Sequence, residues 1–166
     1  MSKKRRYLIA LGSNVRHQRY GRPRDVLTAA LNELDGDGIK VKSVAPTVTS
    51  APLGPSARRY ANSAAVVKTR LMPDELLERF RQVERAFGRK RGGQRWRARV
   101  LDLDIVLWGG GVWCSPGLIV PHADFRTREF VLRPAVAIAG DWRDPISGLT
   151  LRQLLARLTK PRPVRR

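Results

Sequence analysis

Arg99-Val-Leu-Asp-Leu-Asp-Ile-Val-Leu107 is the stretch of sequence that decides the fold. Apolar residues alternate with polar ones through most of it, which predicts a β-strand over residues 100–108. Since side chains of a strand point alternately to its two faces, we expect one apolar face and one acidic face here. One face should carry Leu101, Leu103, Ile105 and Leu107, and the other Asp102 and Asp104. Three glycines follow at 109–111, and we expect them to turn the chain into a short hairpin through residues 112 and 113.

Further periodic segments precede this strand. Residues 7–11 form an apolar run that Gly12-Ser13-Asn14 stops, which predicts a buried strand ending in a turn. Residues 39–48 and 60–71 have strand patterns, the first with an irregularity near Pro46. Two helical patterns complete the set, and each opens on a proline: one runs from 23 to 34, the other from 73 to a stop at 88.

The resulting order is strand, helix, strand, strand, helix, strand, which predicts an α+β fold. In the ferredoxin-like version of this fold, helices pack on an antiparallel sheet. Residues 121–139, helical around 130–138, and a last helix at 151–158 then form a C-terminal helical and hairpin addition. A length of 166 residues fits one domain, with basic tails at about 1–6 and 160–166.

The chain is strongly basic, with 33 Lys+Arg against 14 Asp+Glu and a formal net charge of +19. Such a balance predicts anionic partners: nucleic acid, a membrane surface or phosphorylated small molecules. No apolar run approaches the roughly 18 residues of a membrane span, and residues 7–11 are too few for a signal-peptide core. We therefore expect a cytoplasmic protein with no membrane partner. Cys114 is the only cysteine, which excludes an internal disulfide and a cysteine metal cluster.

Asp102 and Asp104 are the first candidate site. Two carboxylates on one face of an apolar strand repel each other and are costly to desolvate, so a positive partner is needed. Carboxylate oxygens suit Mg²⁺, which keeps some of its waters and shares substrate phosphates. The alternatives are a solvated outer face and salt bridges to the many arginines.

A basic loop upstream is the second candidate. Four arginines flank the indole of Trp96 in the sequence: Arg89, Arg91, Arg95 and Arg99. Arginine forks bind phosphate oxygens bidentately, and a tryptophan can stack on a nucleobase. The chain has no P-loop motif, so metal and arginine would have to hold any nucleotide. A basic loop without a fixed partner is the alternative. His122 could donate to a phosphate or a base edge, or be structural.

Together these segments resemble the 6-hydroxymethyl-7,8-dihydropterin pyrophosphokinase family of folate biosynthesis, over residues 7–158. The resemblance rests on motifs whose order and spacing are specific to that family. They are Leu11-Gly12-Ser13-Asn14, Pro52-Leu53-Gly54-Pro55, Tyr60 with Asn62, Glu84, Gly88, Arg89 and Arg91, Arg95-Trp96, Arg99, Leu101 to Ile105, Pro121-His122, Arg128, and Phe130 to Pro134.

The resemblance implies an enzyme that transfers diphosphate from ATP, its co-substrate, to the hydroxymethyl group of the pterin, releasing AMP. It implies that Asp102 and Asp104 bind two Mg²⁺ ions and that Arg89 and Arg99 face the phosphates. The implied pterin site comprises Ser50, Leu53, Tyr60, Asn62 and Phe130. The implied nucleotide site comprises Glu84, Arg91, Trp96, Ile105, His122 and Arg128.

Some positions depart from the family pattern, namely Ser50-Ala51, Arg81, Arg97-Ala98 and Ala123; they bear on affinity more than on reaction type. One rival reading is a nucleic-acid binding module, since ferredoxin-like sheets can bind RNA. No aromatic-rich RNA-binding strand motif is present, and the two aspartates would repel phosphate without a metal. The other rival is a family member that has lost activity, against which the retained aspartates, Asn62 and aromatic residues argue. We therefore expect small-molecule substrates, no nucleic-acid partner, and a monomer.

Overall fold

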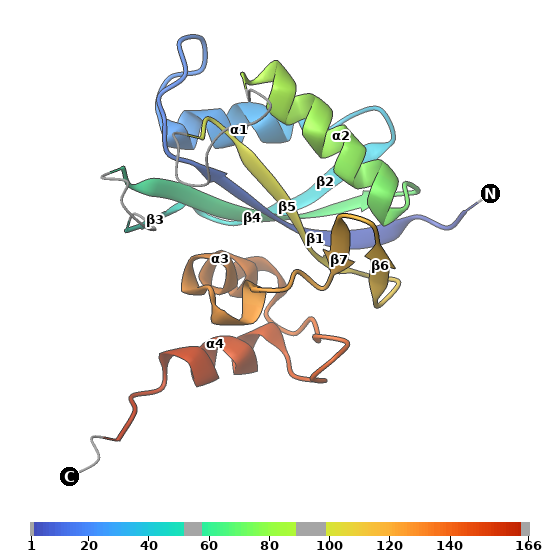
Figure 1. Cartoon of the computed structure of the whole chain (residues 1–166), viewed down its shortest axis with the longest axis vertical. Helices are drawn as coiled ribbons and strands as arrows, with labels where there is room; N and C mark the ends of the chain where they lie inside the picture. The colour runs from blue at the N-terminus through green and yellow to red at the C-terminus, as the bar shows by residue number, and fades with distance from the viewer. Residues whose placement is uncertain (1, 52–57, 89–98, 164–166) are drawn as a thin grey trace.

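A five-stranded antiparallel sheet lies between two helices on one face and, on the other face, a third helix that is covered by a fourth (Figure 1). The computed structural model describes residues 2–51, 58–88 and 99–163. The elements, in chain order, are β1 (Arg5–Ser13), α1 (Pro23–Leu34), β2 (Ile39–Val44), β3 (Val48–Ser50), β4 (Tyr60–Thr69), α2 (Pro73–Ala86), β5 (Asp102–Trp108), β6 (Trp113–Ser115), β7 (Leu118–Val120), a 3₁₀ turn (Phe125–Thr127), α3 (Glu129–Ala139) and α4 (Leu151–Thr159).

Strand β1 lies at the centre, between β4 and β5, in the order β2-β4-β1-β5, and β3 pairs with β4 beside β2. Its side chains alternate between two cores: Tyr7 and Ile9 pack with α1 and α2, whereas Leu8 packs with α3 and α4. The alternation places one apolar layer on each face of the sheet. This arrangement confirms the predicted α+β fold and assigns the C-terminal helices to the second face.

Both early helices begin at the expected prolines, whose fixed φ suits the first helical position. In α4, Thr150 Oγ1 accepts a hydrogen bond from the Gln153 N–H (3.1 Å) and Gln153 Oε1 accepts one from the Thr150 N–H (2.9 Å). This reciprocal pair satisfies two backbone donors at the start of the helix. The helix that packs on α3 therefore has a defined starting point.

The prediction that Leu107 shares a face with Leu103 is wrong. Ile9 pairs with Ile105 but the preceding Leu8 pairs with Leu107, so the register shifts by one residue in β5. A bulge of this kind turns the following side chain to the other face. Leu107 accordingly packs in the core of α3 and α4. The two aspartates precede the bulge and keep their common face.

The segment after β5 also differs from expectation. The turn forms, because the Gly111 N–H donates to the Trp108 carbonyl (3.0 Å), but β6 pairs with β7 instead of returning along β5. The strand expected over 39–48 is divided into β2 and β3. At the N-terminus β1 begins at Arg5, inside the segment expected to be a tail. Among the residues that the structure describes, no helix is long and apolar enough to cross a membrane.

Candidate active site

Three strands align one row of residues at the end of the sheet. Gly12 of β1 pairs with Asp102 of β5 on one side and with Asn62 of β4 on the other. Directly opposed residues of antiparallel strands point to the same face, so Asp102 and Asn62 face the same way. Two strand spacings separate them, about 10 Å between backbones. The one position in the row without a side chain lies between the carboxylate and the amide.

Asp104 continues the site along β5. It lies opposite Ala10, which packs against the core of α3 and α4, so both aspartates face the side of the sheet that carries these helices. Asp104 is exposed, whereas the side chain of Asp102 is 22% exposed. The pair thus has the common face expected from strand alternation, and one member is open to solvent.

Arg99 neutralises part of this charge. Its Nη1 donates to Asp102 Oδ1 at 2.9 Å, a charge-assisted hydrogen bond. Burial lowers the pKa of Arg99, but the charge of Asp102 and its hydrogen bond, together with the charges of Tyr60 and Asp104, leave the pKa raised. The salt bridge considered from sequence as an alternative to metal therefore exists for Asp102. It places a fixed guanidinium beside the carboxylate pair.

Asn14 holds Arg99 in position, a role that the sequence reasoning missed. The Arg99 N–H donates to Asn14 Oδ1 (2.6 Å), and the Asn14 N–H donates to the Arg99 carbonyl (3.0 Å). Asn14 is 5% exposed, and its Nδ2 has no hydrogen-bond partner among the described residues. Its place in the Gly12-Ser13-Asn14 motif was the only signal available, because nothing local in the sequence links positions 14 and 99.

On the β4 side, Asn62 Nδ2 donates to Ser50 Oγ at 2.7 Å, which leaves the amide oxygen directed toward Gly12. Tyr60 lies two residues earlier on the same face. Burial and the nearby charge of Asp102 raise the pKa of the Tyr60 hydroxyl, while Arg99 opposes the shift. The structure thus brings Ser50, Tyr60 and Asn62 into one group beside the aspartates.

Glu84 and Ile105 lie toward the opposite face. Glu84 of α2 is 5% exposed, and its Oε1 accepts the Leu103 N–H at 2.9 Å. Because β5 is an edge strand, this carboxylate satisfies a donor that no neighbouring strand reaches. Ile105 packs in the core of α1 and α2. The described contacts of both residues hold β5 from the face opposite the aspartates, and thereby help to position Asp102 and Asp104.

His122, Arg128 and Phe130 form a second group around the 3₁₀ turn. The His122 N–H donates to the Val106 carbonyl (3.0 Å), which ties this group to β5. Asp124 links the members, since its N–H donates to His122 Nδ1 (3.1 Å) and its carboxylate pairs with Arg128 (2.9 Å). The Arg128 guanidinium carbon lies 5.9 Å from the centre of the Phe130 ring.

An ion pair with a fully buried carboxylate anchors this second group, and sequence reasoning missed it as well. Arg126 donates to both oxygens of Asp144, at 2.7 and 2.8 Å, and Asp144 also accepts from the Ser147 hydroxyl and the Ile146 N–H. Burial alone would raise the pKa of Asp144, but these donors hold it far below its usual range. The 3₁₀ turn is thereby fixed to the loop between α3 and α4.

Four predicted site residues, Leu53, Arg89, Arg91 and Trp96, lie outside the described residues. Within residues 2–51, 58–88 and 99–163, no group of three or more His, Cys, Asp or Glu side chains could hold a metal ion. At this end of the sheet, the described residues present two carboxylates on one face of β5, those of Asp102 and Asp104. This donor set fits Mg²⁺, which is usually bound through one or two carboxylates with water and phosphate oxygens completing its shell.

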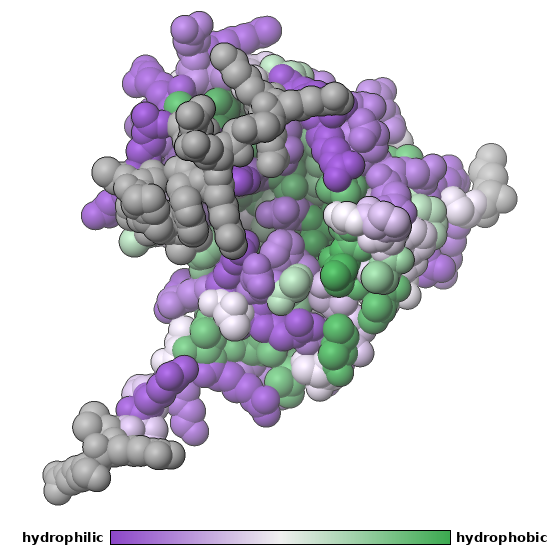
Figure 2. Space-filling view, in the orientation of Figure 1, coloured by the Kyte–Doolittle hydropathy of each residue, from purple (hydrophilic) through white to green (hydrophobic). Residues whose placement is uncertain are grey.

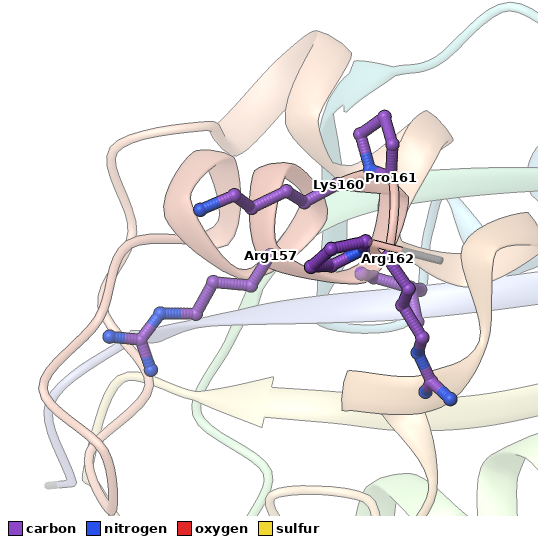
Figure 3. Close-up of a pocket in the computed structure, with 6 residues that line it drawn as sticks. Arg157, Lys160, Pro161 and Arg162 are labelled. Atoms are coloured by element: carbon purple, nitrogen blue, oxygen red, sulfur yellow. The ribbon is translucent and has the colours of Figure 1, made fainter. Parts of the chain in front are cut away.

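A groove of ≈ 330 Å³ lies elsewhere, at the end of α4 (Figure 3). Its lining comes from the last helical turn and the segment that follows: Arg157, Leu158, Lys160, Pro161, Arg162 and Pro163. None of the predicted site residues lines it. Hydrophilic side chains cover much of the face seen in Figure 2, including the end of α4, in keeping with the high net charge.

Comparison with known proteins gives one consistent match. The profile of the family described as 7,8-dihydro-6-hydroxymethylpterin-pyrophosphokinase matches residues 8–140. A Pseudomonas aeruginosa protein named 2-amino-4-hydroxy-6-hydroxymethyldihydropteridine pyrophosphokinase is 39% identical over 153 residues, 91% of this chain and 90% of its own. A Synechocystis protein of the same name is 36% identical over 149 residues, 89% of this chain and 73% of its own.

Solved structures give the same fold. The crystal structure of wild-type Plasmodium falciparum HPPK-DHPS superposes with a TM-score of 0.73 and 12% identity, covering 93% of this chain and 41% of that one. The present chain thus spans less than half of that protein. At this identity the likeness concerns the fold alone.

Proposed function

Because this chain belongs to the 7,8-dihydro-6-hydroxymethylpterin-pyrophosphokinase family, we infer that it transfers diphosphate from ATP to 6-hydroxymethyl-7,8-dihydropterin in folate synthesis. It is a pyrophosphokinase with ATP as co-substrate and a pterin alcohol as acceptor. In the structure, the observation that carries this function is the row Asp102–Gly12–Asn62, which sets a carboxylate and an amide about 10 Å apart on one face.

The reaction requires an in-line attack by the pterin hydroxymethyl oxygen on the β-phosphorus of ATP. A bond forms between that oxygen and the β-phosphorus, the bond from the β-phosphorus to the α,β-bridging oxygen breaks, and AMP leaves. The hydroxyl proton is lost to solvent or to a phosphate oxygen. Since no carbon framework changes, catalysis consists of positioning and of charge stabilisation.

We propose that the β4 side of the row holds the pterin. Asn62 offers an amide oxygen whose direction Ser50 fixes, and this oxygen suits a ring N–H donor. Tyr60 would give one ring face for stacking, with Phe130 on the other side. Leu53 stays a prediction for the same pocket.

We propose that the β5 side holds the phosphates. Arg99 is a fixed guanidinium next to Asp102 and suits a phosphoryl oxygen. Asp102 and Asp104 would hold the magnesium, two ions in our proposal, which when bound would neutralise phosphate charge. The two aspartates would contribute ligand oxygens, and Arg99 would contact phosphate from its position beside Asp102.

Nucleotide contacts are assigned to Arg91, Trp96, His122 and Arg128, with Arg89 facing the phosphates beside Arg99. His122 and Arg128 are already ordered by Asp124, which supports this role. Direct nucleotide contact by Glu84 and Ile105 stays a prediction. A monomeric state and a cytoplasmic location are part of the same proposal.

The position of attack can be tested with ATP radiolabelled at the β-phosphate and, separately, at the α-phosphate. The proposal expects β-label in the pterin product and α-label in AMP, and neither product when the pterin is omitted. Recovery of β-label in ADP would contradict diphosphate transfer. Pterin-independent AMP would contradict the identity of the acceptor.

A further inference from the structure

Gly12 occupies the middle of the row Asp102–Gly12–Asn62, between the proposed phosphate side and the proposed pterin side. It pairs with Asp102 and with Asn62, so a side chain at this position would stand between these two groups. Its φ is not in the left-handed region, unlike that of Gly21 or Gly88. The backbone conformation therefore does not require glycine here, and a different reason must account for it.

The surroundings of Gly12 supply that reason. A Cβ at residue 12 would lie 3.4 Å from Asn62 Oδ1 and 3.7 Å from Tyr60 Cδ1. These are ordinary van der Waals contacts, so a methyl group fits without displacing the backbone. It would, however, cover the amide oxygen that the proposed pterin site uses and crowd the Tyr60 ring at Cδ1. A carbonyl oxygen in contact with a methyl group cannot accept a hydrogen bond from that direction.

We propose that Gly12 is a specificity-determining residue for the pterin acceptor, because its missing side chain leaves Asn62 Oδ1 and the Tyr60 ring accessible. The inference rests on the proposed function and adds a residue to its acceptor site. The Asn62 amide cannot readily turn away, since its Nδ2 is held by Ser50 Oγ at 2.7 Å. A side chain at residue 12 would therefore cover Asn62 Oδ1, because this oxygen cannot move away from it.

The test is the Kd of 6-hydroxymethyl-7,8-dihydropterin, measured by fluorescence with Mg²⁺ and a non-hydrolysable ATP analogue. Gly12→Ala should raise this Kd by about tenfold, the scale of one methyl group in a tight pocket. The Kd of the ATP analogue measured alone should stay unchanged. An unchanged pterin Kd, or an equal rise in both constants, would overturn the proposal.

A double-mutant cycle with Asn62→Ala tests whether Gly12→Ala weakens pterin binding through Asn62. If Gly12 acts by keeping Asn62 Oδ1 open, the added methyl group should weaken binding much less once Asn62 has been removed. Full additivity of the two substitutions would contradict this. Since binding is measured without turnover, failure of diphosphate transfer in wild-type protein would be recognised separately from failure of the Gly12 inference.

Gly12→Val separates the pocket effect from folding. Valine is favoured in strands, so it should preserve or raise the midpoint of thermal unfolding. It is larger than alanine and should weaken pterin binding further. Pterin binding as tight in Gly12→Val as in wild type would overturn the proposal.

Discussion

Asn14 and Arg99 are joined by two hydrogen bonds between positions 85 residues apart, one through the Asn14 side chain and one through its backbone. Arg99 in turn donates to Asp102. The end of β1 therefore fixes the beginning of the segment that carries the aspartates. Among the described residues, the hydrogen bonds that link Asn14 to the proposed reaction centre run through Arg99, which makes Asn14 a positioning residue.

Replacing Asn14 should lower turnover more than substrate binding. Asn14→Ala removes the acceptor for the Arg99 N–H, and we expect kcat to fall by about tenfold or more through misplacement of the guanidinium. Asn14→Asp keeps an acceptor oxygen and replaces Nδ2, which has no partner among the described residues, with a second oxygen whose negative charge lies near Arg99. It should retain more activity than the alanine variant. The measurement is the steady-state kcat of both variants, with thermal unfolding as a control. A lower kcat for Asn14→Asp than for Asn14→Ala would contradict this role of Asn14.

Glu84 should contribute to stability through β5. Glu84→Ala leaves the Leu103 N–H without its acceptor, and we expect the free energy of unfolding to fall by about 1–3 kcal/mol. Glu84→Gln keeps a carbonyl oxygen and should lose less. Glu78 of the same helix is a matched control, because its carboxylate is 51% exposed and pairs only at the surface. Urea denaturation in which Glu84→Ala matches Glu78→Ala would contradict the role.

The Arg126–Asp144 pair should make stability depend on acid pH. The pKa of Asp144 is lowered in the folded state, so the folded protein binds fewer protons than the unfolded one. Its contribution is therefore complete above the ordinary value of 3.8 and declines as pH falls below it. Asp144→Asn should cost about 2 kcal/mol at neutral pH, modest for a buried pair because Arg126 is 28% exposed.

The comparison of wild type with Asp144→Asn by denaturant unfolding at pH 7 and pH 3 tests this dependence. The difference in unfolding free energy should be smaller at the lower pH. Asp141→Asn serves as the control, since that side chain is 95% exposed. A difference that stays constant between the two pH values would show that ionisation of Asp144 is not its source.

The local pattern of apolar and polar residues was sufficient to predict most of the helices and strands. The helix starts at Pro23 and Pro73 and the common face of the two aspartates follow from helical and strand periodicity, which neighbouring residues determine. The turn of Leu107 to the other face could not be predicted, because a bulge depends on the register with Leu8 of another strand. The same limit applies to the pairing of β6 with β7.

The candidate site divides in the same way. Asp102, Asp104 and Asn62 were identified from strand pattern and family motif, and the structure places Asn62 and Asp102 in one row. Asn14 and Asp144 were missed, since their partners lie far along the chain and hydrogen bonds of this kind leave no periodic signal. Gly12 was noticed as part of a turn and of the Leu11-Gly12-Ser13-Asn14 family motif, whereas the role proposed for it depends on its two neighbours across the sheet.

The most direct measurement of the central claim is the initial rate of AMP release from ATP with Mg²⁺ and 6-hydroxymethyl-7,8-dihydropterin, for wild type, Asp104→Asn and Asp141→Asn. We predict pterin-dependent AMP from wild type and from the exposed control. Asp104→Asn should be slower by about a hundredfold or more, with unchanged unfolding, because it loses a charged ligand at the phosphates. An Asp104→Asn variant that keeps most of the wild-type rate would contradict the placement of the reaction at this end of the sheet.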